Sequence, residues 1–154
     1  MPSRVIARKL GLEELTAVLS KEHHEQRKRL DNLVSSFNRK DYATAAEIAR
    51  ELDSSIVQHI VDEENVLLKL FIDVLGREGA DDAITVFQQH RMIHKLTDVI
   101  ARRATASPEG LASTPSELDK LVRSHFGAEE ERIFPWALDI QREMRKKHPK
   151  AHSA

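Results

Sequence analysis

Apolar residues recur every three to four positions in four long stretches of the chain, and this spacing places them on one face of an α-helix. The stretches cover about residues 12–37, 42–75, 81–106 and 114–145. Their apolar positions are Leu12, Leu15, Leu19, Leu30, Leu33 and Phe37, then Ile48, Leu52, Ile56, Val66, Leu70 and Val74, then Val86, Ile93, Ile100 and Ala104, and finally Leu118, Val122, Ile133, Trp136 and Ile140. The pattern predicts four amphipathic helices, each with one buried face.

Short breaks separate the predicted helices. Asn38–Asp41 predicts a turn, Gly76 supplies a helix stop signal, and residues 107–114 form the longest break. Pro135 lies inside the last helix and cannot donate a backbone hydrogen bond, so we expect a kink near it. Because short links bring successive helices back alongside one another, the sequence predicts an all-α fold, an up-down antiparallel four-helix bundle.

The composition agrees with a helical protein of one domain. The chain has 154 residues, which fits a single domain over 1–154, with the bundle over about 12–145 and a tail at each end. Hydrophobic residues make up 40% and charged residues 32%, with only 5 Gly and 5 Pro, as is typical of helical proteins. A formal net charge of -1 gives no electrostatic basis for binding nucleic acid or a membrane surface.

The chain contains no cysteine, which excludes disulfides, zinc fingers and thiolate-ligated iron–sulfur clusters. Any metal must therefore be held by imidazole and carboxylate groups. No apolar run is long enough to predict a membrane span, and the first residues lack the apolar core of a signal peptide. The expected location is therefore the cytoplasm.

Five of the eight histidines fall on the apolar faces of the predicted helices, and they come from all four. They are His23, His59, His90, His94 and His125. Glu63 and Glu129 follow His59 and His125 by four residues, so each glutamate shares the helix face of its histidine. The other three histidines are expected to lie outside this set: His24, His148 and His152. Histidines and carboxylates on four facing helix surfaces indicate a metal site.

Distances along the chain place these seven side chains at one level of the bundle. Counted from the predicted helix ends, their positions agree to about one helical turn at ~1.5 Å per residue. An unpaired carboxylate or imidazole in the core costs several kcal/mol, so a metal-free layer of this kind would oppose folding. Seven imidazole and carboxylate ligands exceed what one zinc ion takes, and they suit two iron ions bridged by the glutamates. With a solvent-derived bridge, one coordination position stays open for a small ligand.

This set of residues resembles the hemerythrin-like, or HHE cation-binding, family. The resemblance depends on His23, His59-x-x-x-Glu63, His90-x-x-x-His94 and His125-x-x-x-Glu129-Glu130, and it covers about residues 12–145. It implies a four-helix bundle around two iron ions joined by an oxo or hydroxo bridge. The implied metal ligands are His23, His59, Glu63, His90, His94, His125 and Glu129. In respiratory members the last carboxylate follows its histidine by five residues, so Glu130 is an alternative, but an undistorted helix favours Glu129.

The resemblance implies two functions that the sequence does not separate. One is the binding of dioxygen or a related small ligand at the carboxylate-bridged centre, for storage, delivery or sensing. The other is a di-iron oxidoreductase, similar to a catalase or peroxidase, that consumes hydrogen peroxide or nitric oxide. The expected partners are therefore O₂, NO or H₂O₂, and the expected state is a monomer or a weak homo-oligomer.

Overall fold

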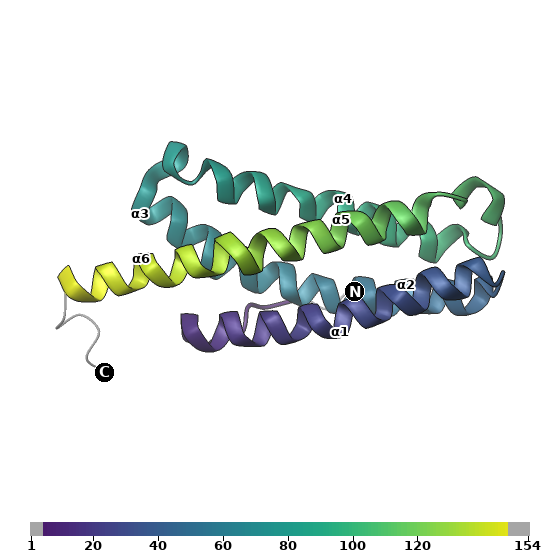
Figure 1. Ribbon diagram of the computed structural model, residues 1–154, viewed down its shortest axis with the longest axis horizontal. Helices are drawn as coiled ribbons and strands as arrows, with labels where there is room; N and C mark the ends of the chain where they lie inside the picture. Colours follow the sequence, from purple (N-terminus) through teal and green to yellow (C-terminus); the bar gives the residue numbers. More distant parts are fainter. Residues whose placement is uncertain (1–4, 148–154) are drawn as a thin grey trace.

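The computed structural model describes residues 5–147 and has the predicted architecture, an up-down bundle of four long helical rods (Figure 1). The rods are α1 (Leu12–Asn38); α2 (Tyr42–Asp62) continued by η1 (Glu63–Leu68) and α3 (Lys69–Gly79); α4 (Asp81–Arg103); and α5 (Thr114–Ala128) continued by η3 (Glu129–Ile133) and α6 (Phe134–Lys147). A short 3-10 helix, η2 (Pro108–Leu111), lies in the link between α4 and α5. The α1–α2 and α4–α5 links lie at one end of the bundle and the α3–α4 link at the other, so the antiparallel four-helix bundle is confirmed.

The ends of the rods follow from local sequence. Asp41 caps the start of α2. Its side chain accepts a hydrogen bond of 3.3 Å from the backbone N–H of Thr44, which satisfies one free donor of the first turn. Gly76 interrupts the α3 region with a φ of 73°, a left-handed conformation that glycine adopts at no steric cost. The stop signal predicted at Gly76 is therefore confirmed.

Two apolar clusters fill the interior, one on either side of a polar layer. The first cluster includes Leu30, Leu33, Leu52, Ile93, Ile100, Leu118 and Val122. The second includes Leu15, Leu19, Leu67, Phe71, Phe87 and Ile133. Each buried side chain of this size stabilises the fold by about 1.5–3 kcal/mol relative to exposure to water. Apolar packing on both sides therefore holds the polar layer in the middle of the bundle.

Two of the rods change from α- to π-helix within this layer. The π-helical segments η1 and η3 begin at Glu63 and Glu129, and the backbone N–H of Phe134 bonds to the carbonyl of Glu129. A π-helical turn contains an additional residue, and such turns are frequent at functional sites. Pro135, where we expected a kink, is the second residue of α6, and the π-helical segment η3 ends two residues before it, so the irregularity near this point takes the form of a π-helical turn.

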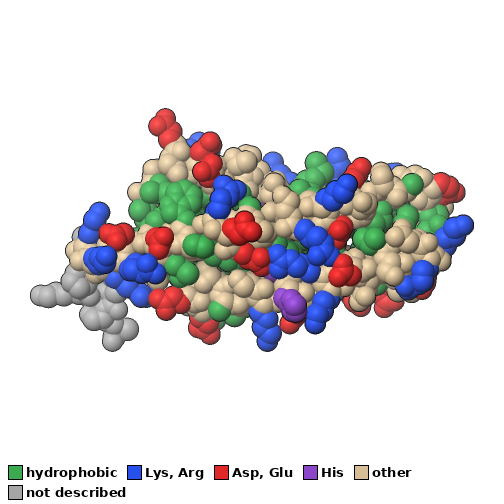
Figure 2. Space-filling model, viewed as in Figure 1, with side chains coloured by type: hydrophobic (Ala, Val, Ile, Leu, Met, Phe, Trp, Pro, Cys, Tyr) green, Lys and Arg blue, Asp and Glu red, His purple; other side chains and the backbone are tan. Residues whose placement is uncertain are grey.

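The surface carries charged groups of both signs. Figure 2 shows basic and acidic side chains interspersed with apolar ones on the displayed face. Within residues 5–147, none of the helices combines the length and the apolar character that crossing a membrane requires.

Candidate metal centre

Six side chains from all four rods meet in the polar layer. They are His23 of α1, His59 of α2, Glu63 of η1, His90 of α4, His125 of α5 and Glu129 of η3. Each has an exposed fraction of 4% or less. Their ligand atoms form two groups of four, within each of which all the atoms lie inside 4.8 Å of one another. One group is His23, His59, Glu63 and Glu129, and the other is Glu63, His90, His125 and Glu129.

The two glutamates belong to both groups because their oxygens reach histidines on both sides. Oε1 of Glu63 contacts Nε2 of His59, while Oε2 lies 2.9 Å from Nε2 of His90. Oε1 of Glu129 lies 3.1 Å from Nε2 of His23 and 3.3 Å from Nε2 of His125. Two cations placed in these groups would therefore share both carboxylates.

His94 does not join the layer, contrary to the expectation that it faces the core. Its side chain is 55% exposed, and its Nδ1 lies 2.7 Å from Oδ1 of Asp53. The inward line of α4 passes instead through His90, Ile93 and Thr97, which are all buried. A step of four residues turns about 40° around an ideal helix, and at this point of α4 that turn takes His94 out of the interior.

The structure also separates Glu129 from Glu130, which the sequence left as alternatives. Glu129 is fully buried between the two groups of histidines. Glu130 is 30% exposed at its side chain and forms a two-point ion pair with Arg27, at 2.8 and 2.9 Å. Glu130 nevertheless contacts the layer, because its Oε1 lies 3.1 Å from Nδ1 of His23. The geometry thus places Glu129 inside and Glu130 behind a histidine.

His24 is exposed, as expected, whereas His148 and His152 lie outside the described residues.

Each of the four buried histidines turns Nε2 inward and Nδ1 outward. The outward neighbours are Glu130 for His23 at 3.1 Å, Glu22 for His59 at 3.2 Å, Gln89 for His125 at 2.9 Å, and Glu64 for His90 at 3.7 Å. An acceptor on the outer nitrogen fixes the orientation of an imidazole and makes the inner nitrogen a better metal ligand. This arrangement is the one found around metal-bound histidines in proteins.

The N-terminal segment contributes to this outer set through Arg8. Its guanidinium donates to both carboxylate oxygens of Glu22, at 3.0 and 3.1 Å. Its backbone N–H and its Nε donate to the buried Asp62, at 2.8 and 2.7 Å. The segment before α1, where we expected a tail, is therefore bound to the bundle next to the polar layer.

Several buried polar atoms at the centre have no hydrogen-bond partner among the described residues. They are Oε1 of Glu63, Nε2 of His125 and both carboxylate oxygens of Glu129. Buried polar atoms are almost always paired in native proteins, and exceptions require an explanation such as an ion. Imidazole nitrogens and carboxylate oxygens that converge without partners are the donor set that a transition metal takes. The residues present therefore fit a bound metal.

The protonation of the layer supports the same interpretation. Burial, together with the charge of Glu63, raises the pKa of Glu129 well above its usual value. Burial alone would lower the pKa of His59, but the carboxylates of Glu63 and Glu22 raise it to about 9. At neutral pH the metal-free layer therefore keeps a proton on His59, and burial opposes the charged form of Glu129. A bound cation would instead stabilise the negative charge of both carboxylates.

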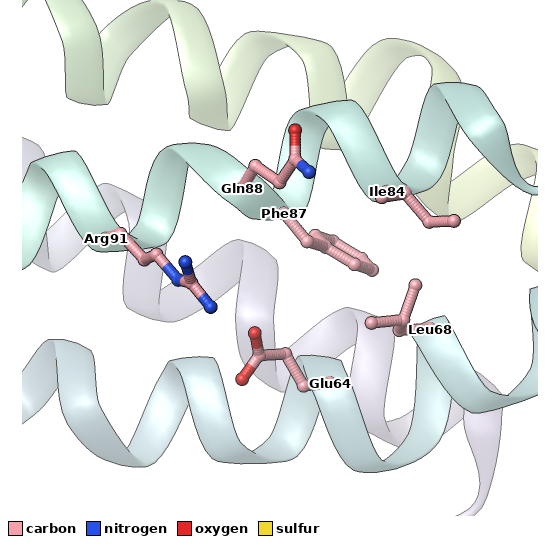
Figure 3. Close-up of a pocket in the computed structure, with 6 residues that line it drawn as sticks. All are labelled: Glu64, Leu68, Ile84, Phe87, Gln88 and Arg91. Atoms are coloured by element: carbon pink, nitrogen blue, oxygen red, sulfur yellow. The ribbon is translucent and has the colours of Figure 1, made fainter.

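A pocket of about 290 Å³ opens beside the His90 side of the centre (Figure 3). It is lined by Glu64, Leu68, Ile84, Phe87, Gln88 and Arg91. Glu64 and Arg91 extend toward each other from η1 and α4, and the ring of Phe87 lies between these two segments. The Phe87 ring stacks on His90 with a centroid separation of 5.3 Å. Phe87 therefore separates the pocket from the buried centre.

Residues 3–71 match a family model described as the hemerythrin HHE cation binding domain. Over this range the chain is similar to that family. The match contains His23, His59 and Glu63, and it confirms the resemblance predicted from the sequence. The other three members of the layer, His90, His125 and Glu129, lie beyond the matched range, and the bundle brings them to the same level. Comparisons with curated proteins and with solved structures gave no match.

Proposed function

We propose that this hemerythrin-like chain is a non-haem di-iron protein that binds dioxygen or a related small ligand. The observation that carries the proposal is the pair of four-residue groups that share Glu63 and Glu129. Each group offers two imidazoles and two carboxylates, a donor set that suits iron. Two ferrous ions would supply the electrons that binding of dioxygen requires.

The count of ligands leaves room for a small molecule. Because His94 lies outside the layer, each ion would have four ligands from the protein, whereas an octahedral ion takes six. With His94 as a ligand we expected one open coordination position. Without it, more than one coordination position remains for ligands that the protein does not supply.

The surroundings would protect a bound ligand from water. Leu19, Ile56 and Phe126 have exposed fractions of 3% or less, and the Phe126 ring stacks on His23 at a centroid separation of 3.8 Å. Removing water from such a site strengthens its electrostatic interactions and limits loss of protons or electrons to solvent.

A second candidate function is favoured by the similarity of the two groups. Because His94 lies outside the polar layer, each group contains two histidines. Neither metal ion would therefore have a third imidazole among its ligands. Open positions on two neighbouring ions suit a di-iron oxidoreductase that consumes hydrogen peroxide or nitric oxide, since such reactions involve two oxygen atoms or two NO molecules.

The test is a stopped-flow comparison of anaerobic, iron-loaded protein mixed with O₂, H₂O₂ or NO. Reversible binding of O₂, seen as an absorption band that disappears on deoxygenation, supports the first function. Release of O₂ from peroxide or catalytic loss of NO supports the second. Both activities should disappear in Glu63→Gln and persist in the matched histidine variant His94→Ala. Rapid irreversible oxidation without any band or turnover would contradict both.

A further inference from the structure

We propose that the two metal positions are unequal: the position at His23 and His59 binds its ion first and more tightly than the position at His90 and His125. We call these the α1–α2 position and the α4–α5 position. The proposal rests on the proposed function, in that it requires two ions. It goes further by assigning them an order, which depends on the groups behind the four histidines.

Behind His59, the outer acceptor is a carboxylate held in place by an arginine. Oε1 of Glu22 lies 3.2 Å from Nδ1 of His59. Both oxygens of Glu22 accept hydrogen bonds from Arg8, whose Nε and backbone N–H are bound in turn to Asp62. Since Arg8 is fixed at both its backbone and its side chain, Glu22 has a defined position behind His59.

Behind His23, the same arrangement occurs with different residues. Oε1 of Glu130 lies 3.1 Å from Nδ1 of His23. Arg27 binds both oxygens of Glu130, at 2.9 and 2.8 Å, and its guanidinium lies 5.5 Å from the centre of the Phe126 ring. Both histidines of the α1–α2 position therefore have a carboxylate acceptor that an arginine orients.

The α4–α5 position lacks such support. Nδ1 of His125 faces Oε1 of Gln89, an uncharged amide, at 2.9 Å. Nδ1 of His90 has no hydrogen-bond partner among the described residues, and its nearest carboxylate, Glu64, lies 3.7 Å away with a side chain that is 45% exposed. On this side of the centre, the ring of Phe87 stacks on His90 and also lines the pocket.

The arginines offset part of the negative charge of Glu22 and Glu130, so net charge alone does not rank the two positions. The advantage of the α1–α2 position comes from stronger acceptors and from rings that are already oriented. Partners of this kind behind a ligating histidine typically change metal affinity by about 10- to 100-fold.

The decisive experiment locates the first ion. The full chain is loaded anaerobically with one equivalent of Co²⁺ and crystallised, and anomalous scattering at the cobalt edge gives the occupancy of each position. We expect the greater part of the cobalt between His23 and His59. Equal occupancy, or a preference for His90 and His125, would overturn the inference while leaving the di-metal site intact. Absence of cobalt from both positions would overturn the proposed function as well.

A two-step binding curve alone would not show which position binds first. Both positions use Glu63 and Glu129, so a second ion would bind more weakly than the first even if the two positions were equal. Calorimetric titration with Co²⁺ is therefore combined with variants. Glu22→Gln should weaken the first step by about 10-fold or more. Glu25→Gln makes the same change at an exposed position of the same helix and should leave both steps unaltered.

Gln89→Glu tests the opposite direction, because it gives His125 a carboxylate acceptor. We expect this variant to strengthen the second step and to shift cobalt toward the α4–α5 position. A first step that is unchanged in Glu22→Gln, together with a second step unchanged in Gln89→Glu, would overturn the inference.

Discussion

Removal of the metal should destabilise the whole bundle. Four buried atoms of the centre lack hydrogen-bond partners: Oε1 of Glu63, Nε2 of His125 and both oxygens of Glu129. Each unsatisfied buried polar atom costs about 1–3 kcal/mol, and we count each of the four at the low end, about 4 kcal/mol in total, because a histidine nitrogen or a carboxylate oxygen lies close to three of them. A domain of this size changes its melting temperature by about 2–4 °C per kcal/mol, which gives an expected decrease of about 8–16 °C on removal of the metal.

The assay is thermal unfolding followed by circular dichroism, before and after treatment with an iron chelator. Glu129→Gln serves as a matched variant, because it removes one carboxylate charge from the centre and its amide can donate a hydrogen bond to a neighbouring carboxylate oxygen. We expect this variant to melt at or above the temperature of chelated wild type and to respond much less to the chelator. Equal melting temperatures of loaded and chelated wild-type protein would refute the reasoning that the layer needs a cation.

Three further predictions follow from the positions of individual side chains. His90→Ala should lose one of the two ions, whereas His94→Ala should retain both, as measured by elemental analysis; loss of metal in His94→Ala would contradict its placement outside the layer. Glu63→Ala should lose both ions, because its two oxygens face opposite groups, and retention of one full equivalent would show that the carboxylate is not shared. Chelated protein should become less stable as pH rises from about 6.5 toward 9. Burial would lower the pKa of His59, but the neighbouring carboxylates raise it to about 9, so the folded protein keeps a proton that the unfolded chain releases in this range. Urea unfolding at the two pH values measures this, and a midpoint that is constant or rises would contradict the assignment.

The fold and much of the layer could be predicted from the sequence because both depend on helical periodicity. Four long helices that each have one apolar face can bury these faces in few arrangements other than a bundle. A histidine that falls on the apolar face of such a helix is then expected to point inward. His23, His59 and His125 follow this rule, and each is buried.

The exception is His94, and its position shows where periodicity is insufficient. A stripe is wide, so residues at its edge face the interior or the solvent according to how neighbouring helices pack. In α4, Ile93 and Thr97 occupy the inward positions, and His94 pairs with Asp53 of α2. That pairing is a contact between residues 41 apart, which no local pattern encodes.

The outer contacts could not be predicted for a similar reason. Arg8 lies in a segment without periodicity, and its contact with Asp62 spans 54 residues of the chain. Glu22 and Glu130 do carry a weak signal, since each is the direct neighbour of a buried residue, His23 or Glu129. Their phase predicts a solvated surface, whereas packing turns each of them behind a histidine.

The central claim is that Glu63 and Glu129 hold two ions side by side. X-ray absorption spectroscopy of iron-loaded protein, with the iron content of the same sample, tests it most directly. We expect two irons per chain and an iron–iron distance of less than about 4 Å, the separation found in two-metal sites. One iron per chain, or iron with only light-atom neighbours, would contradict it.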